Sequence, residues 1–215
     1  RRMALGRNPL TVLCCDNLPG NGQIVRRLVT EMAERRDAEL ARWIEREIRF
    51  PSSMVDRIVP ASTDATRSLA ASLIGAEDRL ALETEPFTQW VIEDDFAFGR
   101  PAWEAGGAIF VSSVHAYEKM KLRLLNGSHT LIAYLGQLNG LDYVRDVMGV
   151  KAHVDRVRRH MEAVLPTLDP VPHIDLVAYR EELVARFSNP AIAHRTAQIA
   201  MDGTQKMPQR IFAPA

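Results

Sequence analysis

The first half of the chain mixes short apolar segments with stretches of helical periodicity. Apolar and β-branched residues at 8–15 predict a strand, and the turn-rich DNLPGNG follows at 16–22. Helical spacing then predicts one long helix over residues 23–47, and Asp64 is placed to cap another over residues 65–74. SMVDRIVP is predicted to be a short connector or a strand, and short extended segments are predicted within LALETE, TQWVIED and AIFVSS. Together these elements indicate an α/β portion.

The second half has the periodicity of consecutive helices separated by prolines. We expect helices over residues 114–138, 142–148, 151–164, 176–187 and 190–201. The predicted fold is therefore mostly α, with an α/β portion at residues 1–112 joined to an all-helical portion at residues 113–215.

Composition narrows the class of protein only moderately. The 215 residues are 47% hydrophobic and 25% charged, which is typical of a globular protein that buries a core. The 27 basic and 27 acidic side chains argue against nucleic acid or an anionic membrane as a partner. No apolar run reaches the roughly 18 residues of a membrane span, and no signal-peptide pattern is visible, so we expect a cytoplasmic protein. Cys14 and Cys15 are expected to be small buried hydrophobes.

A glycine pattern resembles a phosphate-binding loop but is incomplete. Gly20 and Gly22 stand between a predicted strand and a predicted helix, yet Val25 occupies the position of the third glycine. We therefore expect an ordinary turn, or a polar loop in which Asn17 and its neighbours face a ligand.

The sequence gives little support for a metal site or for a catalytic nucleophile. The six histidines form no HExxH pair, and neither cysteine has metal-ligand spacing to a histidine, so no metal is expected. His153 and His160 are seven apart on an arginine-rich helix, where we expect a solvated face. No serine lies in a GxSxG elbow.

Three polar residues share one face of a strongly helical run at 120–130. At about 100° per residue, Asn126 lies roughly 140° and His129 roughly 80° around the helix from Lys121. On an apolar face such groups need partners or a substrate, because an unpaired buried polar group costs about 1–3 kcal/mol. Gly127 suggests that another group approaches the backbone closely. The spacing alone favours a structural face, with a snorkelling lysine and a hydrogen-bonded histidine.

Five segments spread over nearly the whole chain carry a resemblance. They are CDNLPGNG (15–22), FPSSMVDRIVP (50–60), EPFTQWVIED (85–94), KLRLLNGSH (121–129) and HRTAQIAMDGTQKMPQR (194–210). In this order they resemble the long-chain mannitol dehydrogenase family, which includes mannitol 2-dehydrogenase and fructuronate reductase (D-mannonate oxidoreductase). The resemblance implies that residues 1–112 are the carboxyl-terminal part of a Rossmann-type domain whose amino-terminal half, with its phosphate loop, is missing. It also implies an all-helical substrate domain at residues 113–215, like the carboxyl-terminal domain of 6-phosphogluconate dehydrogenase.

The family implies a metal-independent oxidoreductase that uses NAD or NADP to interconvert a polyol, mannitol-like, and its ketose. Lys121 would be the general acid/base, since a desolvated lysine has a lowered pKa and can take a proton near neutral pH. Asn17 and Asn126 would donate hydrogen bonds to the reacting oxygen, each typically worth about 3 kcal/mol. His129 would orient the substrate through a neighbouring hydroxyl.

Asp56, Lys206 and Arg195 are expected to hold further hydroxyls or a carboxylate, although structural pairing is an equal alternative for Asp56 and Lys206. A hexuronate substrate needs a cationic partner, whereas a polyol does not, and the sequence leaves both open, as it leaves NAD and NADP open. Two other classes also stay open: a hydroxyacid dehydrogenase with an arginine clamp, and an inactive helical scaffold. Because the phosphate loop is missing, we expect the isolated chain neither to bind NAD tightly nor to turn over.

Overall fold

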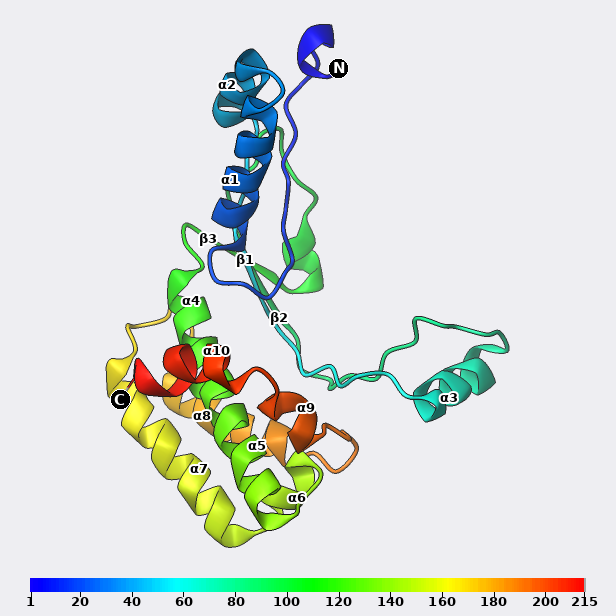
Figure 1. Ribbon diagram of the computed structural model, residues 1–215, viewed down its shortest axis with the longest axis vertical. Coiled ribbons are helices and arrows are strands. Elements are labelled where there is room, and N and C mark those ends of the chain that lie inside the picture. Colours follow the sequence, from blue (N-terminus) through cyan, green and yellow to red (C-terminus); the bar gives the residue numbers. More distant parts are fainter. Residues whose placement is uncertain (215) are drawn as a thin grey trace. The chain divides into compact units, whose positions relative to one another are not determined.

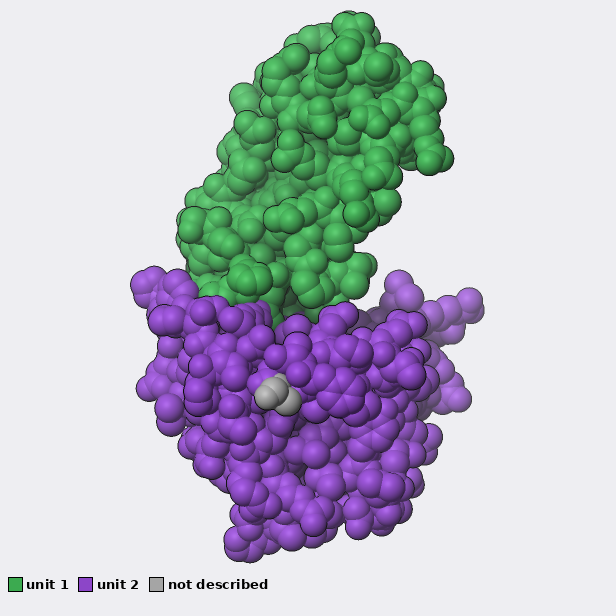
Figure 2. Space-filling view, turned by 60° about the vertical axis from the view of Figure 1, so that its left-hand side comes forward, with its two compact units in different colours: residues 1–56, 88–118 green, residues 57–87, 119–215 purple. Residues whose placement is uncertain are grey.

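The chain forms two compact units, each assembled from two separate segments (Figure 2). The computed structural model describes residues 1–214. Unit 1 comprises Arg1–Asp56 and Thr88–Glu118, and unit 2 comprises Arg57–Phe87 and the chain from Lys119 onward. About 54% of the residues are helical and the sheet is small, which confirms a mostly α fold. The division at residues 1–112 and 113–215 stays a prediction.

A three-stranded sheet lies in unit 1 (Figure 1). Its central strand, β2 (Gln89–Glu93), pairs antiparallel with β1 (Ser53–Asp56) and parallel with β3 (Ala108–Val111). Val91 and Ile92 of β2 are fully buried, as expected of a strand with neighbours on both sides. The extended segments predicted within TQWVIED and AIFVSS are thereby confirmed, and of the two alternatives for SMVDRIVP the strand is the one that forms.

Two predicted extended segments are wrong. Residues 8–15 form no strand and contribute only an isolated bridge between Thr11 and Arg49, where Val12 N–H donates to the Arg49 carbonyl at 2.9 Å. The LALETE segment at 80–85 is irregular, with Leu80 and Leu82 exposed. Apolar alternation makes a strand only where another strand can pair with it, and none does along these segments.

Unit 1 contains the helices η1 (Met3–Leu5), α1 (Asn21–Glu34), α2 (Ala38–Glu47) and η2 (Trp103–Gly106). Of these, α1 and α2 enclose a small apolar cluster. The single long helix predicted over 23–47 is wrong, because Asp37 starts a new helix by accepting hydrogen bonds from the N–H groups of Glu39 and Leu40. Helices α1 and α2 then pack together around Ala33, Ala41, Ile44, Ile48 and Phe50.

Most helices follow residue 114, as predicted (Figure 1). The structure contains α4 (His115–Met120), η3 (Lys121–Asn126), α5 (Gly127–Asn139), α6 (Val144–Met148), α7 (Lys151–Val164), η4 (Leu165–Thr167), α8 (Leu176–Phe187), α9 (Thr196–Ala200), α10 (Gly203–Met207) and η5 (Pro208–Phe212). The predicted bounds of α7 and α8 are confirmed, whereas a helix over 190–201 is wrong: only α9 forms there. In unit 2, α5 packs against α6, α7 and α9, and the core includes Leu124, Ile132, Val157, Met161 and Leu183.

Helix α3 (Asp64–Ile74) is confirmed, but its cap differs from the prediction. Thr63 is the N-cap and accepts a hydrogen bond from the N–H of Thr66, while Asp64 is the first helical residue. No residue of α3 is buried, and Leu69, Leu73 and Ile74 are exposed.

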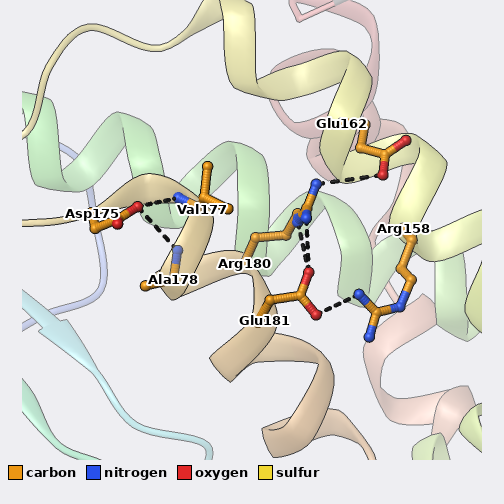
Figure 3. A network of polar contacts seen from close by, with 7 residues as sticks. All are labelled: Arg158, Glu162, Asp175, Val177, Ala178, Arg180 and Glu181. Atoms are coloured by element: carbon orange, nitrogen blue, oxygen red, sulfur yellow. Dashed lines mark hydrogen bonds and ion pairs between the residues drawn. The ribbon is translucent and has the colours of Figure 1, made fainter.

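A surface network of charges links α7 and α8 (Figure 3). Arg180 contacts Glu162 at 3.4 Å and Glu181 at 2.8 Å, and Glu181 also pairs with Arg158. At the start of α8, Asp175 caps the helix by accepting from two backbone N–H groups. Within residues 1–214, no helix is both long enough and apolar enough to cross a membrane.

Candidate active site

The helical run that carries Lys121, Asn126 and His129 contains a π-helical turn. Lys121 is the first residue of π-helix η3 and is buried, Asn126 is the last, and His129 lies in the first turn of α5. In a π-helix the hydrogen bonds join residues five apart, so Lys121 and Asn126 lie closer in rotation than the 140° of a regular α-helix. The predicted 100° spacing is therefore wrong within this segment. Such turns occur often at functional sites.

His129 is a buried imidazole with an unused nitrogen. Its ring lies 4.5 Å from the Phe187 ring and 5.3 Å from the His194 ring, measured between centroids. Among residues 1–214, no group hydrogen-bonds to its Nε2 atom. Burial holds the pKa of His129 well below 6.5, and nearby His194, Arg186, Arg210 and Lys121 lower this pKa further. The ring is therefore neutral near pH 7 and can exchange a hydrogen bond with a hydroxyl.

Gly127 allows a close approach to the helix, as predicted. A Cβ atom at this position would lie 2.9 Å from the carbonyl oxygen of Arg210 and 3.1 Å from Nε2 of His160. The solvated face expected for His153 and His160 is wrong, because His153 is buried and His160 is half-buried. The same helix α7 packs against α5, so this face belongs to the core of unit 2.

Two of the predicted site residues lie in unit 1. Asn17 is exposed in the loop before α1, and its backbone N–H donates to Oδ1 of Asp16 at 2.8 Å. Asp56 is the buried last residue of β1. Asn21, which the sequence placed with Asn17 in a polar loop that could face a ligand, instead bonds the backbone: its side chain accepts from Ser53 N–H at 2.9 Å and donates to the Ser53 carbonyl at 2.9 Å. This amide fixes the end of the DNLPGNG loop to β1.

The two glycines of that loop serve the packing of the chain. Gly20 has a positive φ of 61°, and its N–H donates to Oε1 of Glu118 at 2.9 Å. A Cβ atom on Gly22 would lie 2.3 Å from the carbonyl oxygen of Phe50. With the N–H of Gly20 already bonded and Gly22 covered by backbone, this turn does not fit a nucleotide phosphate.

Lys206 and Arg195, the two cations predicted to bind the substrate, have other neighbours in the structure. Lys206 is half-buried and its Nζ lies 3.8 Å from Oδ2 of Asp202. Arg195 is exposed, with its guanidinium carbon 5.8 Å from the centre of the Tyr143 ring. Neither is among the cations that lower the pKa of His129.

Arg186 is instead a charged residue beside His129, and the sequence did not reveal it. Its Nε and Nη2 donate to the carboxylate of Glu85 at 2.9 and 2.7 Å, and both side chains are almost fully buried. Glu85 also accepts from the Ile58 N–H at 2.6 Å, and the Arg186 guanidinium carbon lies 3.8 Å from the centre of the Phe87 ring. The pair therefore ties the segment 57–87 to the end of α8.

A small cavity lies at the junction of these groups. Arg186, His129 and His194 contribute its polar lining, and the apolar lining comes from Ile58, Val144, Phe187 and Ile192. Nδ1 of His194 has no hydrogen-bond partner within residues 1–214, and burial lowers the pKa of this histidine. The cavity thus offers unused imidazole nitrogens in apolar surroundings.

No metal cluster is visible in the described part of the chain: residues 1–214 hold no group of three or more His, Cys, Asp or Glu side chains suited to an ion. Both cysteines are free thiols. Cys15 is exposed and Cys14 is only partly buried, so the expectation of two buried cysteines is wrong.

Known protein families match both halves of the chain. Residues 1–105 match the Rossmann domain of mannitol dehydrogenase, and residues 113–215 match the mannitol dehydrogenase C-terminal domain. The chain belongs to the mannitol dehydrogenase family, and the resemblance inferred from the five segments is confirmed.

Similar proteins span both polyol and hexonate chemistry. The uncharacterized oxidoreductase YeiQ of Escherichia coli (strain K12) is 49% identical over 219 residues, and the D-mannonate oxidoreductase of the same organism is 47% identical over 214. Each match covers 99% of this chain and 44% of the relative. The structure of Pseudomonas fluorescens mannitol 2-dehydrogenase, a ternary complex with NAD and D-mannitol, superposes with a TM-score of 0.87 at 43% identity. That match covers 99% of this chain and 44% of the solved one, so the chain spans less than half the length of these relatives.

Proposed function

We propose that the chain supplies the substrate-handling part of an NAD(P)-dependent, metal-independent oxidoreductase that interconverts a polyol, mannitol-like, and its ketose. The observation that carries this proposal is the buried Lys121 on a π-helical turn, followed eight residues later by the neutral, buried His129. Membership of the mannitol dehydrogenase family supports hydride transfer as the reaction in which these two residues take part. Residues 1–112 would be the end of the nucleotide-binding domain and residues 113–215 the substrate domain, resembling that of 6-phosphogluconate dehydrogenase.

Each polar residue has a role in moving or holding one part of the substrate. In the full-length protein a bound NAD or NADP would supply the acceptor for the hydride of the alcohol carbon. Lys121 takes the hydroxyl proton through Nζ and returns it in the reverse reaction. The amides of Asn17 and Asn126 donate hydrogen bonds to the oxygen as it becomes a carbonyl.

The remaining residues hold the rest of the substrate. His129 exchanges a hydrogen bond with a neighbouring hydroxyl through its unused Nε2. Asp56, Lys206 and Arg195 would bind more distant hydroxyls or a carboxylate. Exclusion of water from the substrate site strengthens each of these hydrogen bonds.

A second candidate substrate class is a hexuronate, as in a fructuronate reductase (D-mannonate oxidoreductase). The observation that favours it is that Lys121 and Arg210 both act on His129 through their positive charge, while the charge of Arg186 is balanced by Glu85. Positive groups around a site favour an anionic ligand.

A substrate panel on the full-length protein tests the proposal. Mannitol, arabinitol, sorbitol and D-mannonate are each supplied with NAD and with NADP, and formation of the reduced nucleotide is followed by absorbance. We expect turnover of at least one of them without added metal and in the presence of a chelator. Absence of turnover with every substrate and both nucleotides would overturn the proposal.

A further inference from the structure

The junction between η3 and α5 is held by a hydroxyl side chain. Asn126 is the last residue of the π-helical turn, and its carbonyl accepts a hydrogen bond from Oγ1 of Thr130 at 2.9 Å. Thr130 is buried, and burial strengthens a hydrogen bond that is made. The side-chain amide of Asn126 has no hydrogen-bond partner within residues 1–214. Thr130 therefore holds the backbone of Asn126 while the amide of the same residue stays available to a ligand.

Arg210 orients the hydroxyl of Thr130. Its Nη1 donates to Oγ1 at 3.4 Å, which occupies a lone pair of the hydroxyl and leaves the hydroxyl proton for the Asn126 carbonyl. A charged donor polarises the hydroxyl, and hydrogen bonds in such a chain strengthen one another. Arg210 belongs to η5, which packs against both η3 and α5. The chain of hydrogen bonds thus runs from η5 through Thr130 to the last carbonyl of η3.

Tight packing confines the same junction from two other elements. Gly127 follows η3 directly, and a Cβ atom there would lie 2.9 Å from the carbonyl oxygen of Arg210 and 3.1 Å from Nε2 of His160. The N–H of Gly127 donates to the carbonyl of Leu122, five residues earlier, which is the spacing of a π-helix. Packing therefore limits where the turn can lie, and the hydrogen bonds at its end decide its spacing.

A π-helical turn needs such support, because it is rare and less favourable than a regular α-helix. Uncommon backbone arrangements persist where the surrounding structure fixes them, and they cluster at functional sites. A return to α-helical spacing would rotate Lys121 away from Asn126, so the two side chains would no longer reach one oxygen. A misplacement of about 1 Å in such a constellation can cost about 10²-fold in rate.

We propose that Thr130 is a positioning residue of the reaction: its hydroxyl, oriented by Arg210, holds the π-helical turn that brings Lys121 and Asn126 to the same oxygen. This inference rests on the roles proposed for Lys121 and Asn126. Thr130 itself does not touch the substrate and acts through the backbone of Asn126.

Thr130→Val tests the hydroxyl, because valine keeps the shape of threonine and removes its hydrogen bonds. Thr130→Ser restores the hydroxyl without the methyl group. Ser188→Ala is the matched control: Oγ of Ser188 donates to the Val184 carbonyl at 2.8 Å, the same bond to the residue four positions back, at the exposed end of α8. The full-length wild type and its variants are assayed with a substrate and nucleotide that turn over, and thermal melting reports whether each variant is folded.

In Thr130→Val we expect kcat to fall about tenfold to a hundredfold with less than about a threefold change in KM, because Lys121 and Asn126 act on the oxygen as it reacts. Thr130→Ser should stay within about threefold of the wild type. Arg210→Gln leaves the hydroxyl in place but without its charged donor, so kcat should fall less, by about threefold to tenfold. Ser188→Ala should leave kcat and KM unchanged.

Hydrogen exchange gives a second readout that needs no turnover. The amide of Gly127 reports on the π-helical turn, since it bonds the carbonyl of Leu122. In full-length Thr130→Val this amide should exchange at least about tenfold faster than in the wild type, because the turn opens more often. Thr130→Ser and Ser188→Ala should keep the wild-type exchange rate.

Several outcomes would overturn the inference. A lowered melting temperature with an unchanged kcat would make Thr130 merely structural, and equal losses in Thr130→Ser and Thr130→Val would show that the hydroxyl is not the cause. Unaltered exchange at Gly127 in Thr130→Val would also refute it. If Thr130→Val does not fold, Arg210→Gln decides by the same two measurements, and wild-type values there overturn the inference. Absence of wild-type turnover with every substrate instead overturns the proposed function, and exchange at Gly127 then still decides whether Thr130 holds the turn.

Discussion

Helix α8 carries two charged regions that are built from the same residue types but differ in burial. Near its C-terminal end, Arg186 and Glu85 form a pair whose side chains are 6% and 2% exposed. Earlier in the helix, Arg180 and Glu181 join a network with Arg158 and Glu162 in which both glutamates are more than 40% exposed (Figure 3). Only the first pair lies beside the cavity with His129. Burial, and not the presence of an ion pair, therefore distinguishes the charges that belong to the candidate site.

The comparison between buried and exposed charges predicts that the largest effect on activity comes from changing Lys121, the buried lysine of the candidate site. In the full-length protein, Lys121→Ala should lower kcat by about 10²- to 10⁴-fold, because the reaction loses its general acid/base. Nucleotide affinity, measured by calorimetric titration, should stay close to that of the wild type. Lys151→Ala is the matched control, since Lys151 is exposed and pairs with Asp155 at 2.9 Å on α7. A comparable loss of activity in the control would show that burial does not single out Lys121.

The buried ion pair should matter far more for stability than the surface network. Glu85→Gln leaves the Arg186 charge buried without its counter-ion, which should lower the free energy of unfolding by about 3–5 kcal/mol. Glu181→Gln on the same helix should cost less than about 1 kcal/mol, because water screens its pairs with Arg158 and Arg180.

Urea denaturation of the two variants measures this difference directly. A double variant, Glu85→Leu with Arg186→Met, sharpens it: removal of both charges should cost less than removal of Glu85 alone. Equal destabilisation by Glu85→Gln and Glu181→Gln would refute the distinction between the two regions.

A third effect concerns the close approach at Gly127. Gly127→Ala places a Cβ atom 2.9 Å from the carbonyl oxygen of Arg210, so helix and backbone must move apart, at a cost of about 1–3 kcal/mol. Gly106→Ala is a suitable control because a Cβ atom there would have no neighbour within 4 Å. Thermal unfolding compares the two, and a Gly127→Ala protein as stable as the control would contradict the tight contact.

The smallest effect is a dependence of stability on pH. Burial lowers the pKa of His129, His160 and His194 below the ordinary 6.5. Above pH 6.5 the folded and unfolded states are both neutral at these rings, so their contribution does not change with pH. Below it the unfolded chain binds protons that the folded chain does not, and the free energy of unfolding falls, by at most about 1.4 kcal/mol per pH unit for each histidine.

The loss should continue as the pH falls toward the folded pKa values. His129→Gln should reduce the slope measured by urea denaturation between pH 6.5 and 5, whereas His115→Gln, at an exposed position, should leave it unchanged. An unchanged slope in His129→Gln would contradict the burial assigned to its ring.

Local patterns in the sequence were enough to predict much of the fold. Helices α7 and α8 have strong helical periodicity between clear stops, and their predicted bounds agree with the structure. Strand pairing is not encoded locally, so residues 8–15 have a strand-like composition and yet form a single bridge. The break between α1 and α2 depends on the capping by Asp37, which is weaker as a signal than the continuous periodicity around it.

Helical spacing alone identified candidate site residues only where they share one helix, whereas Asn17 and Asp56 were assigned through the family resemblance. Lys121, Asn126 and His129 stand within nine residues, and helical spacing placed them on one face, although the π-helical turn changed the angle between the first two. Arg186 and Arg210 come from other segments, and their relation to His129 depends on tertiary packing. The signal that could have drawn attention to Arg186 is its place beside Phe187, on the apolar face of a helix that also buries Leu183.

The most direct test of the central claim, that Lys121 carries the proton, is chemical rescue of the full-length Lys121→Ala protein. The rate of reduced-nucleotide formation is measured with saturating substrate, with and without a small primary amine such as methylamine. We expect turnover to be lost without amine and to rise with its concentration, because a free amine can enter the space of the lysine side chain and take the proton. Turnover at the wild-type rate without amine would contradict the account.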